Sequence, residues 1–265
     1  MQTNTKSSIV KLAKSILLCG FLASVIHNAC GQQNYEIQVY GSDTILKGQT
    51  MVELHSNFSA EGDKNPTDGT LPTDNAVRET LEVTHGFTPW FETGFYVFSS
   101  AHSGDGWQWV GDHIRPRVRV PEEWHWPVGL SLSAEVGYQR PSFSTDTWNF
   151  ELRPIIDKKI GPLYLAFNPA LEKSLQGPGS ANGWGFSPAA KISLDVTKKV
   201  ALGAEYYASF DRVDSWGKFG DQQHQLFPSI DIDIAPKWEF NFGVGFGLTH
   251  SSDHLIVKMI LGRQF

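Results

Sequence analysis

Three arginines alternate with proline and valine along one stretch of the chain: Arg115, Arg117 and Arg119. Alternate residues of a β-strand point to the same face, so the three guanidinium groups are expected to share one face, about 6.7 Å apart. Fixed charges on the wall of an aqueous pore govern which ions and solutes pass through it. The spacing therefore predicts a pore-lining ladder of positive charge.

Acidic residues at equivalent positions of other segments are predicted to line the same pore. Asp231 and Asp233 are expected to face the arginine ladder from the opposite wall, which would produce a transverse field. Three further acids complete the predicted lining: Glu135, Glu205 and Glu239. The alternative interpretation is a salt-bridged plug, because many charges buried inside a narrow lumen must be paired.

Enzymatic chemistry would need a nucleophile beside a base. Three serines lie near histidines, in the pairs His55 and Ser56, Ser100 and His102, and His250 and Ser251. Adjacent residues of a strand point to opposite faces, and none of the pairs lies in a recognisable hydrolase motif. No catalytic residue is predicted and the protein is not expected to be an enzyme, although a lipid hydrolase stays as an alternative because triads depend on spatial geometry.

Few residues of the sequence are suited to bind a metal. Four residues could approach a metal at the mouth of a pore, namely His102, Asp105, Asp112 and His113, but their spacing matches no known site. The two cysteines, Cys19 and Cys30, both precede residue 32 and would leave with a cleaved leader. The sequence predicts no metal site and no cofactor.

The elements that must position these charges are alternating segments separated by connections rich in Gly, Pro, Asp and Asn. In the clearest one, residues 238–249, large apolar side chains occupy one face, and glycine, Glu239 and Asn241 occupy the other. This pattern is typical of a transmembrane strand with lipid outside and lumen inside. The predicted strands are 49–60, 76–87, 90–101, 108–120, 128–139, 146–158, 162–173, 183–196, 199–212, 222–235, 237–249 and 254–265.

These segments predict an all-β fold: a single antiparallel transmembrane β-barrel of about twelve strands. The connections alternate between short and long, as expected for periplasmic turns and external loops. Five prolines fall inside predicted strands, where each removes a ladder donor and predicts a local bulge: Pro116, Pro154, Pro169, Pro188 and Pro228.

The N-terminus has the pattern of a secretory signal, with three lysines, an apolar stretch over residues 16–26 and small residues at 29–31. Residues 1–31 are predicted to be a signal peptide that is cleaved, and an acylated lipoprotein cleaved before Cys30 is the alternative. Residues 32–48 are then expected to form a short periplasmic N-terminal segment, and residues 49–265 the barrel.

Charge and hydropathy exclude several classes. The formal net charge is −6, and it becomes more negative when the lysine-containing signal is removed, which argues against a nucleic-acid partner. No apolar run after the signal approaches the length of a membrane-spanning helix. A membrane location would therefore require a closed barrel, in which every backbone group is satisfied.

The last residues, HLIVKMILGRQF, place apolar side chains on one face and end on Phe265. This segment resembles the C-terminal insertion signal of outer-membrane barrels, although Arg263 stands where an apolar residue is usual. The resemblance implies recognition by the barrel assembly machinery. The longer stretch HQLFPSIDIDIAPKWEFNFGVGFGLTHSSDHLIVKMILG resembles a family of outer-membrane proteins named for the MetA pathway of phenol degradation. It covers mainly the last third of the chain and implies an outer-membrane barrel and small-solute transport.

The sequence therefore predicts a porin-like channel of the bacterial outer membrane, in contact with its lipids, for passive passage of small polar or amphiphilic solutes. A plugged structural barrel and an outer-membrane lipid hydrolase are the alternatives. They differ in what they predict: a channel conducts, a hydrolase turns over lipid, and a structural barrel does neither.

Overall fold

The computed structural model describes residues 35–66, 68–102, 104 and 106–265. The predicted signal peptide, residues 1–31, lies outside the described residues. No helix in the described part of the chain is long and apolar enough to cross a membrane.

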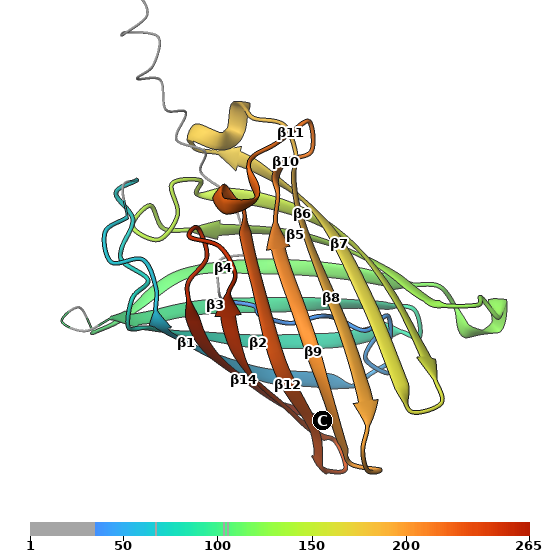
Figure 1. The fold of residues 1–265 in the computed structure, drawn as a ribbon. Coiled ribbons are helices and arrows are strands. Elements are labelled where there is room, and N and C mark those ends of the chain that lie inside the picture. The colour runs from blue at the N-terminus through green and yellow to red at the C-terminus, as the bar shows by residue number, and fades with distance from the viewer. Residues whose placement is uncertain (1–34, 67, 103, 105) are drawn as a thin grey trace, which may run out of the picture.

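Twelve long antiparallel strands form the wall of a closed barrel (Figure 1). They are β1 (Thr50–Glu61), β2 (Ala76–Thr88), β3 (Phe91–His102), β4 (Gly106–Arg119), β5 (Gly129–Gln139), β6 (Trp148–Ile160), β7 (Leu163–Gln176), β8 (Gly185–Asp195), β9 (Val200–Ser209), β12 (Gln223–Ala235), β13 (Trp238–Gly247) and β14 (Leu255–Gln264). Pairing of the first strand with the last, β1 with β14, closes the sheet. The predicted fold class and the number of long strands are confirmed.

A short hairpin extends the wall beyond β8 and was not predicted. It consists of β10 (Asp211–Arg212) and β11 (Ser215–Trp216), and its Arg212 pairs with Gly185 of β8. Arg212 binds both carboxylate oxygens of Asp214 at 2.9 and 2.7 Å, and this hydrogen bonding lowers the pKa of Asp214. Strands of two residues carry too little alternation to be recognised in a sequence. Three single 3-10 turns complete the elements of the described part of the chain: η1 (Glu122–Trp124), η2 (Pro178–Ala181) and η3 (Phe219–Asp221).

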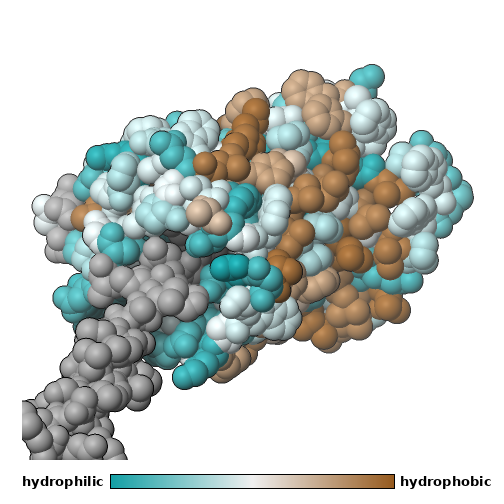
Figure 2. Space-filling view, turned by 90° about the horizontal axis from the view of Figure 1, so that it is seen from above, coloured by the Kyte–Doolittle hydropathy of each residue, from teal (hydrophilic) through white to brown (hydrophobic). Residues whose placement is uncertain are grey.

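The outer surface carries a broad apolar band, because the outward positions of the strands are mostly large and hydrophobic. Figure 2 shows hydrophobic side chains gathered in this band, with hydrophilic ones on either side. Exposed aromatic residues border it at the end that holds the C-terminus (Phe87, Trp90, Trp124, Trp126 and Phe265) and at the other end (Trp107, Trp109, Trp148, Trp184, Trp216 and Phe219). Aromatic girdles around an apolar band are typical of barrels that span a bilayer.

The predicted bulges at the five prolines are wrong. Pro154 pairs in register with Leu132, and Pro169 pairs directly with Pro188. The register shifts lie elsewhere, for example between Phe98 and Ser99. In an antiparallel ladder each backbone N–H points toward only one neighbouring strand, so a proline removes one bond without requiring an inserted residue.

Residues 35–46, here called the lumenal segment, lie inside the barrel. For these twelve residues the structure corrects the expectation of a periplasmic segment. Apolar side chains of this segment pack against inward residues of the wall, with Ile37 and Val39 beside Phe227 and Ile256. Tyr35 packs in a second cluster around Phe98. Alternating apolar residues that precede the first strand thus fill the lumen, and Figure 1 shows this blue segment running within the barrel.

Candidate functional site in the barrel lumen

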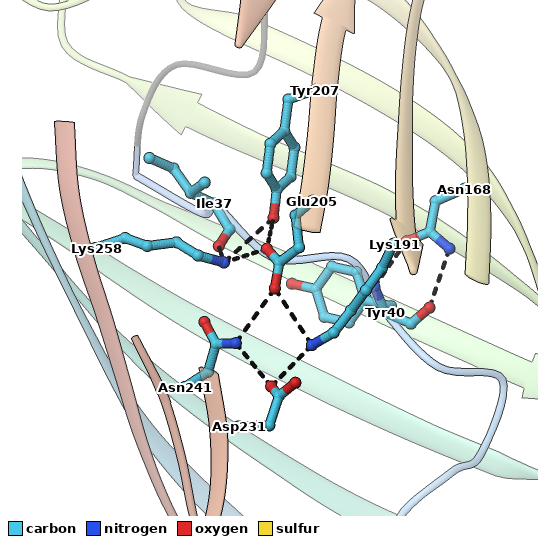
Figure 3. Close-up of polar contacts among 9 residues, drawn as sticks. All are labelled: Ile37, Tyr40, Asn168, Lys191, Glu205, Tyr207, Asp231, Asn241 and Lys258. Carbon is cyan, nitrogen blue, oxygen red and sulfur yellow. Dashed lines mark hydrogen bonds and ion pairs between the residues drawn. The ribbon is translucent and has the colours of Figure 1, made fainter. Parts of the chain in front are cut away.

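Side chains of the wall hold the lumenal segment mainly through hydrogen bonds to the backbone groups of the segment. Asn168 of β7 makes two hydrogen bonds to Tyr40: its side-chain oxygen accepts from the Tyr40 N–H at 2.7 Å, and its amide nitrogen donates to the Tyr40 carbonyl at 3.0 Å (Figure 3). Lys258 of β14 donates to the Ile37 carbonyl at 2.9 Å. These side chains provide the partners that a β-ladder would otherwise supply to the extended segment.

Both ends of the segment are held in the same manner. The Tyr35 carbonyl accepts from Asn57 at 3.0 Å and from Thr80 at 2.9 Å. Toward the C-terminal end of the barrel, Arg117 donates to the carbonyls of Gly41 and Asp43 at 3.0 and 2.7 Å. The Ile45 N–H donates to Glu92 at 2.6 Å. The wall therefore recognises the extended backbone path of the segment in addition to its apolar side chains.

Two glycines of the wall make room for the segment. A Cβ atom at Gly86 would lie 2.3 Å from the carbonyl oxygen of Ile45. A Cβ atom at Gly129 would lie 2.1 Å from the hydroxyl of Ser42, which itself donates to Asp157 at 2.6 Å. The wall is thus shaped to allow a close approach of the lumenal segment at these two positions.

The three ladder arginines do lie on the inner face of β4, but carboxylates of neighbouring elements neutralise them. Arg115 binds Glu82 of β2 at 2.8 Å, and Arg117 binds Glu92 of β3 at 2.6 Å. Arg119, nearer the end of the barrel, contacts Asp43 at 3.2 Å and Glu122 at 3.1 Å.

The lumenal segment also covers this ladder. The ring of Tyr40 lies 4.1 Å from the guanidinium carbon of Arg115 and 5.1 Å from that of Arg153. Cations at this distance from an aromatic ring are attracted to its face. The arginines are therefore engaged by the segment through both aromatic and backbone contacts.

Across the lumen, Glu205 of β9 lies at the centre of a second network, shown in Figure 3. Its carboxylate is ion-paired with Lys258 and, at 3.2 Å, with Lys191, and it accepts a hydrogen bond from the Tyr207 hydroxyl at 2.5 Å. Asp231 joins this network through Lys191 at 2.8 Å and Asn241 at 2.7 Å.

Asp231, which was predicted to face the arginine ladder from the opposite wall, makes none of its described contacts with those arginines. Asp231 binds groups of β8 and β13 instead, the strands on its own side of the lumen. A carboxylate reaches a partner one or two strands away more readily than one across a lumen that the chain itself occupies. Each side of the wall is neutralised locally.

The three other predicted acids have different surroundings. Glu135 is buried and lies 2.5 Å from the ring nitrogen Nδ1 of His113. Asp233 and Glu239 are exposed near the C-terminal end of the barrel, and neither carboxylate has an ion pair within the described part of the chain. These two are the predicted acids that remain open to solvent.

Sequence reasoning missed Asn168 and Tyr40, which make the most specific contacts of the lumenal segment. Asn168 stands at an inward position between Ala166 and Ala170, so a polar residue between two inward alanines was a usable signal. For Tyr40 the short alternating run of residues 35–40 was the signal, but alternation does not say which surface a segment will meet.

The three serines considered as nucleophiles are bonded elsewhere. The Ser56 hydroxyl donates to Glu79 at 2.6 Å, that of Ser100 to the Val77 carbonyl at 3.1 Å, and that of Ser251 to the Gly220 carbonyl at 3.3 Å. His55 points inward and Ser56 outward, as the alternation of β1 requires. These contacts do not favour a hydrolytic triad.

The fold and its lumen define a class: a closed twelve-stranded transmembrane β-barrel whose lumen holds a segment of its own chain. Among solved structures, the chain is similar to the NanC porin, with a TM-score of 0.50 and 6% identity over 81% of this chain and 98% of that one. The KdgM porin gives a TM-score of 0.49 and 11% identity, with coverages of 81% and 98%. The outer membrane protein Omp33 of Acinetobacter baumannii gives 0.48 and 12%, with coverages of 85% and 100%.

At such low identity, the likeness to the NanC porin shows the shared barrel fold alone. A comparison with family models finds no match for the chain. A comparison with curated proteins finds none either.

Proposed function

We propose that this protein is an outer-membrane channel for small polar or amphiphilic solutes and that the lumenal segment closes it. The observation that carries the proposal is that the wall is complete without the segment. Every long strand is paired on both sides, and the segment adds no strand to the described sheet. Its removal would leave a closed barrel with a polar inner face.

The outer surface of the barrel supports a location in the outer membrane. An apolar band between two aromatic girdles matches a bilayer, and Phe265 lies exposed at the end of a strand that pairs fully with β1 and β13. We therefore place the protein in the outer membrane, with β14 as the segment recognised by the barrel assembly machinery. The finer resemblance to the MetA-pathway family stays a prediction of the sequence.

Once the segment has left, the passage would be lined by the residues predicted to face it: Arg115, Arg117, Arg119, Glu135, Glu205, Asp231, Asp233 and Glu239. Because Glu82 and Glu92 offset the first two arginines, the net field inside would be weaker than a bare arginine ladder produces. The solvent-exposed Asp233 and Glu239 favour cations at that mouth.

The test is single-channel conductance in planar bilayers, comparing the refolded mature chain with a variant that lacks residues 32–46. The variant should show stable open steps, whereas the mature chain should be closed for most of the recording. Folding of both is checked by the shift in electrophoretic mobility between heated and unheated samples. A folded variant that remains silent would overturn the channel and favour a structural barrel, and lipid turnover by either protein would favour the hydrolase.

A further inference from the structure

A buried cluster of Glu53 and His55 on β1 and Glu82 on β2 lies in the inner wall of the barrel. Their exposed fractions are 7%, 0% and 1%. Glu53 and His55 are two residues apart and share the inner face, while Glu82 is the direct cross-strand partner of Glu53. One ligand atom from each residue lies within 4.8 Å of the other two.

His55 is the unusual member of the cluster. Neither of its ring nitrogens has a hydrogen-bond partner among the described residues, although the side chain is fully buried. Its Nε2 points to Glu82 Oε2 at 3.4 Å, beyond the usual range for a hydrogen bond. An unpaired polar group in a buried position is costly, so the arrangement lacks a partner that would satisfy the imidazole.

The two carboxylates need the same partner. Glu53 and Glu82 are directly opposite on paired strands, where like charges repel. Arg115 and the Thr84 hydroxyl both bind Oε1 of Glu82, at 2.8 and 2.6 Å. The other oxygen, Oε2, is left facing His55, and Glu53 has no ion pair in the described part of the chain. A cation between the three residues would satisfy all of them.

The distances fit a small transition-metal ion. Tetrahedral ligands about 2.0–2.1 Å from zinc lie roughly 3.3–3.4 Å from one another. The separation of 3.4 Å between His55 Nε2 and Glu82 Oε2 matches this edge length. Glu53 would need to move inward by on the order of 1 Å, which a rotation of its side chain supplies.

We propose that Glu53, His55 and Glu82 bind one divalent transition-metal ion of the zinc type. An imidazole ligand suits such ions, whereas calcium and magnesium prefer sites built of oxygen ligands alone. Arg115 and Thr84 orient the Glu82 carboxylate through its other oxygen, Oε1, as outer partners of metal ligands commonly do. Three protein ligands leave a fourth position for water. The proposal does not depend on the channel.

The sequence alone did not predict this metal site, because its three ligands come from two strands and lie together only through the pairing register of those strands.

The experiment uses the full mature chain without an affinity tag, refolded with Zn²⁺ or Co²⁺ and dialysed against metal-free buffer. Bound metal is measured by mass spectrometry, and four-coordinate Co²⁺ by its visible absorption. Refolding with the ion present gives it access to the buried site.

The variants are His55→Gln and Glu53→Gln, with His113→Gln as the matched control. His113 is also an inward histidine bonded to a glutamate, Glu135, but no second carboxylate from the described residues completes a set there. We expect about one ion per wild-type barrel, at least a tenfold loss of retained metal in His55→Gln, a smaller loss in Glu53→Gln, and retention in His113→Gln.

Equal retention by the wild type and by a correctly folded Glu53→Gln or His55→Gln barrel would overturn the site. So would a wild-type barrel that retains no metal after refolding with either ion. Should His55→Gln fail to fold, the comparison of Glu53→Gln with the wild type decides. Conductance is not used as a readout, so failure of the channel and failure of the metal site remain distinguishable.

Discussion

The barrel wall and the lumenal segment satisfy their backbones in different ways. Each long strand of the wall shares a continuous ladder with two neighbours, for example β1 with β2 and β14. Residues 35–46 instead depend on separate side chains of the wall, including Asn168, Lys258 and Arg117. The ladder is cooperative, whereas the contacts of the segment can be removed one at a time.

The balance of energies differs accordingly. A hydrogen bond contributes about 0.5–1.5 kcal/mol net, while ordering one backbone residue costs about 1–2 kcal/mol. The segment therefore gains only modest free energy from its seating, and burial of Tyr35, Ile37 and Val39 must supply the rest. The segment is therefore expected to respond to a ligand or a mutation that leaves the wall intact.

The largest effect on stability is expected from Lys258→Met, because Lys258 binds both the wall and the lumenal segment. It leaves the buried Glu205 paired with Lys191 alone among the described residues, a loss of up to about 5 kcal/mol in the free energy of unfolding. It also removes the bond to Ile37, so openings should become more frequent. Urea unfolding followed by tryptophan fluorescence and bilayer recordings measure the two effects. Unchanged stability would contradict the ion pair.

The next effect is confined to the wall. Leu81 faces outward near the middle of β2, and Leu81→Arg should lower the free energy of unfolding in lipid vesicles by about 2–4 kcal/mol. Leu175→Arg, at the outer end of β7, is the control and should cost about 0–1 kcal/mol. Neither should alter the closed state of the lumen. Equal costs at the two positions would argue against the assigned membrane band.

A smaller effect, confined to the segment, is expected from Asn168→Leu. The change removes both hydrogen bonds to Tyr40, which should weaken seating by about 1–3 kcal/mol because two backbone groups lose their partners. Hydrogen exchange of residues 35–46 should accelerate while exchange of the strands is unchanged. Protection that falls equally in segment and wall would mean that the two regions are not separable.

The smallest effect is expected from Tyr40→Leu. This variant retains the backbone bonds but loses the attraction between the ring and Arg115, about 0.5–2 kcal/mol. Channel openings in bilayer recordings should be more frequent than in the wild type and less frequent than in Asn168→Leu. The reverse order would show that aromatic contacts, not backbone bonds, hold the segment.

Strand positions and the side of each strand that faces the lumen were predictable from the sequence. The predicted strands 76–87 and 254–265 differ from β2 and β14 by one residue at their ends. Alternation is a local property with a period of two, so it also placed Arg115, Arg117 and Arg119 on the inner face correctly. The closed barrel follows because an apolar outer face leaves no other way to satisfy the strand edges.

Which charged side chains form ion pairs depends on the tertiary structure. Glu82 reaches Arg115, and Glu205 reaches Lys258, because pairing register and strand tilt set their heights in the lumen, and alternation contains neither. The same register assembles Glu53, His55 and Glu82. The place of residues 35–46 also depended on the finished barrel: their apolar side chains required a buried surface, and its polar wall supplied partners for their backbone.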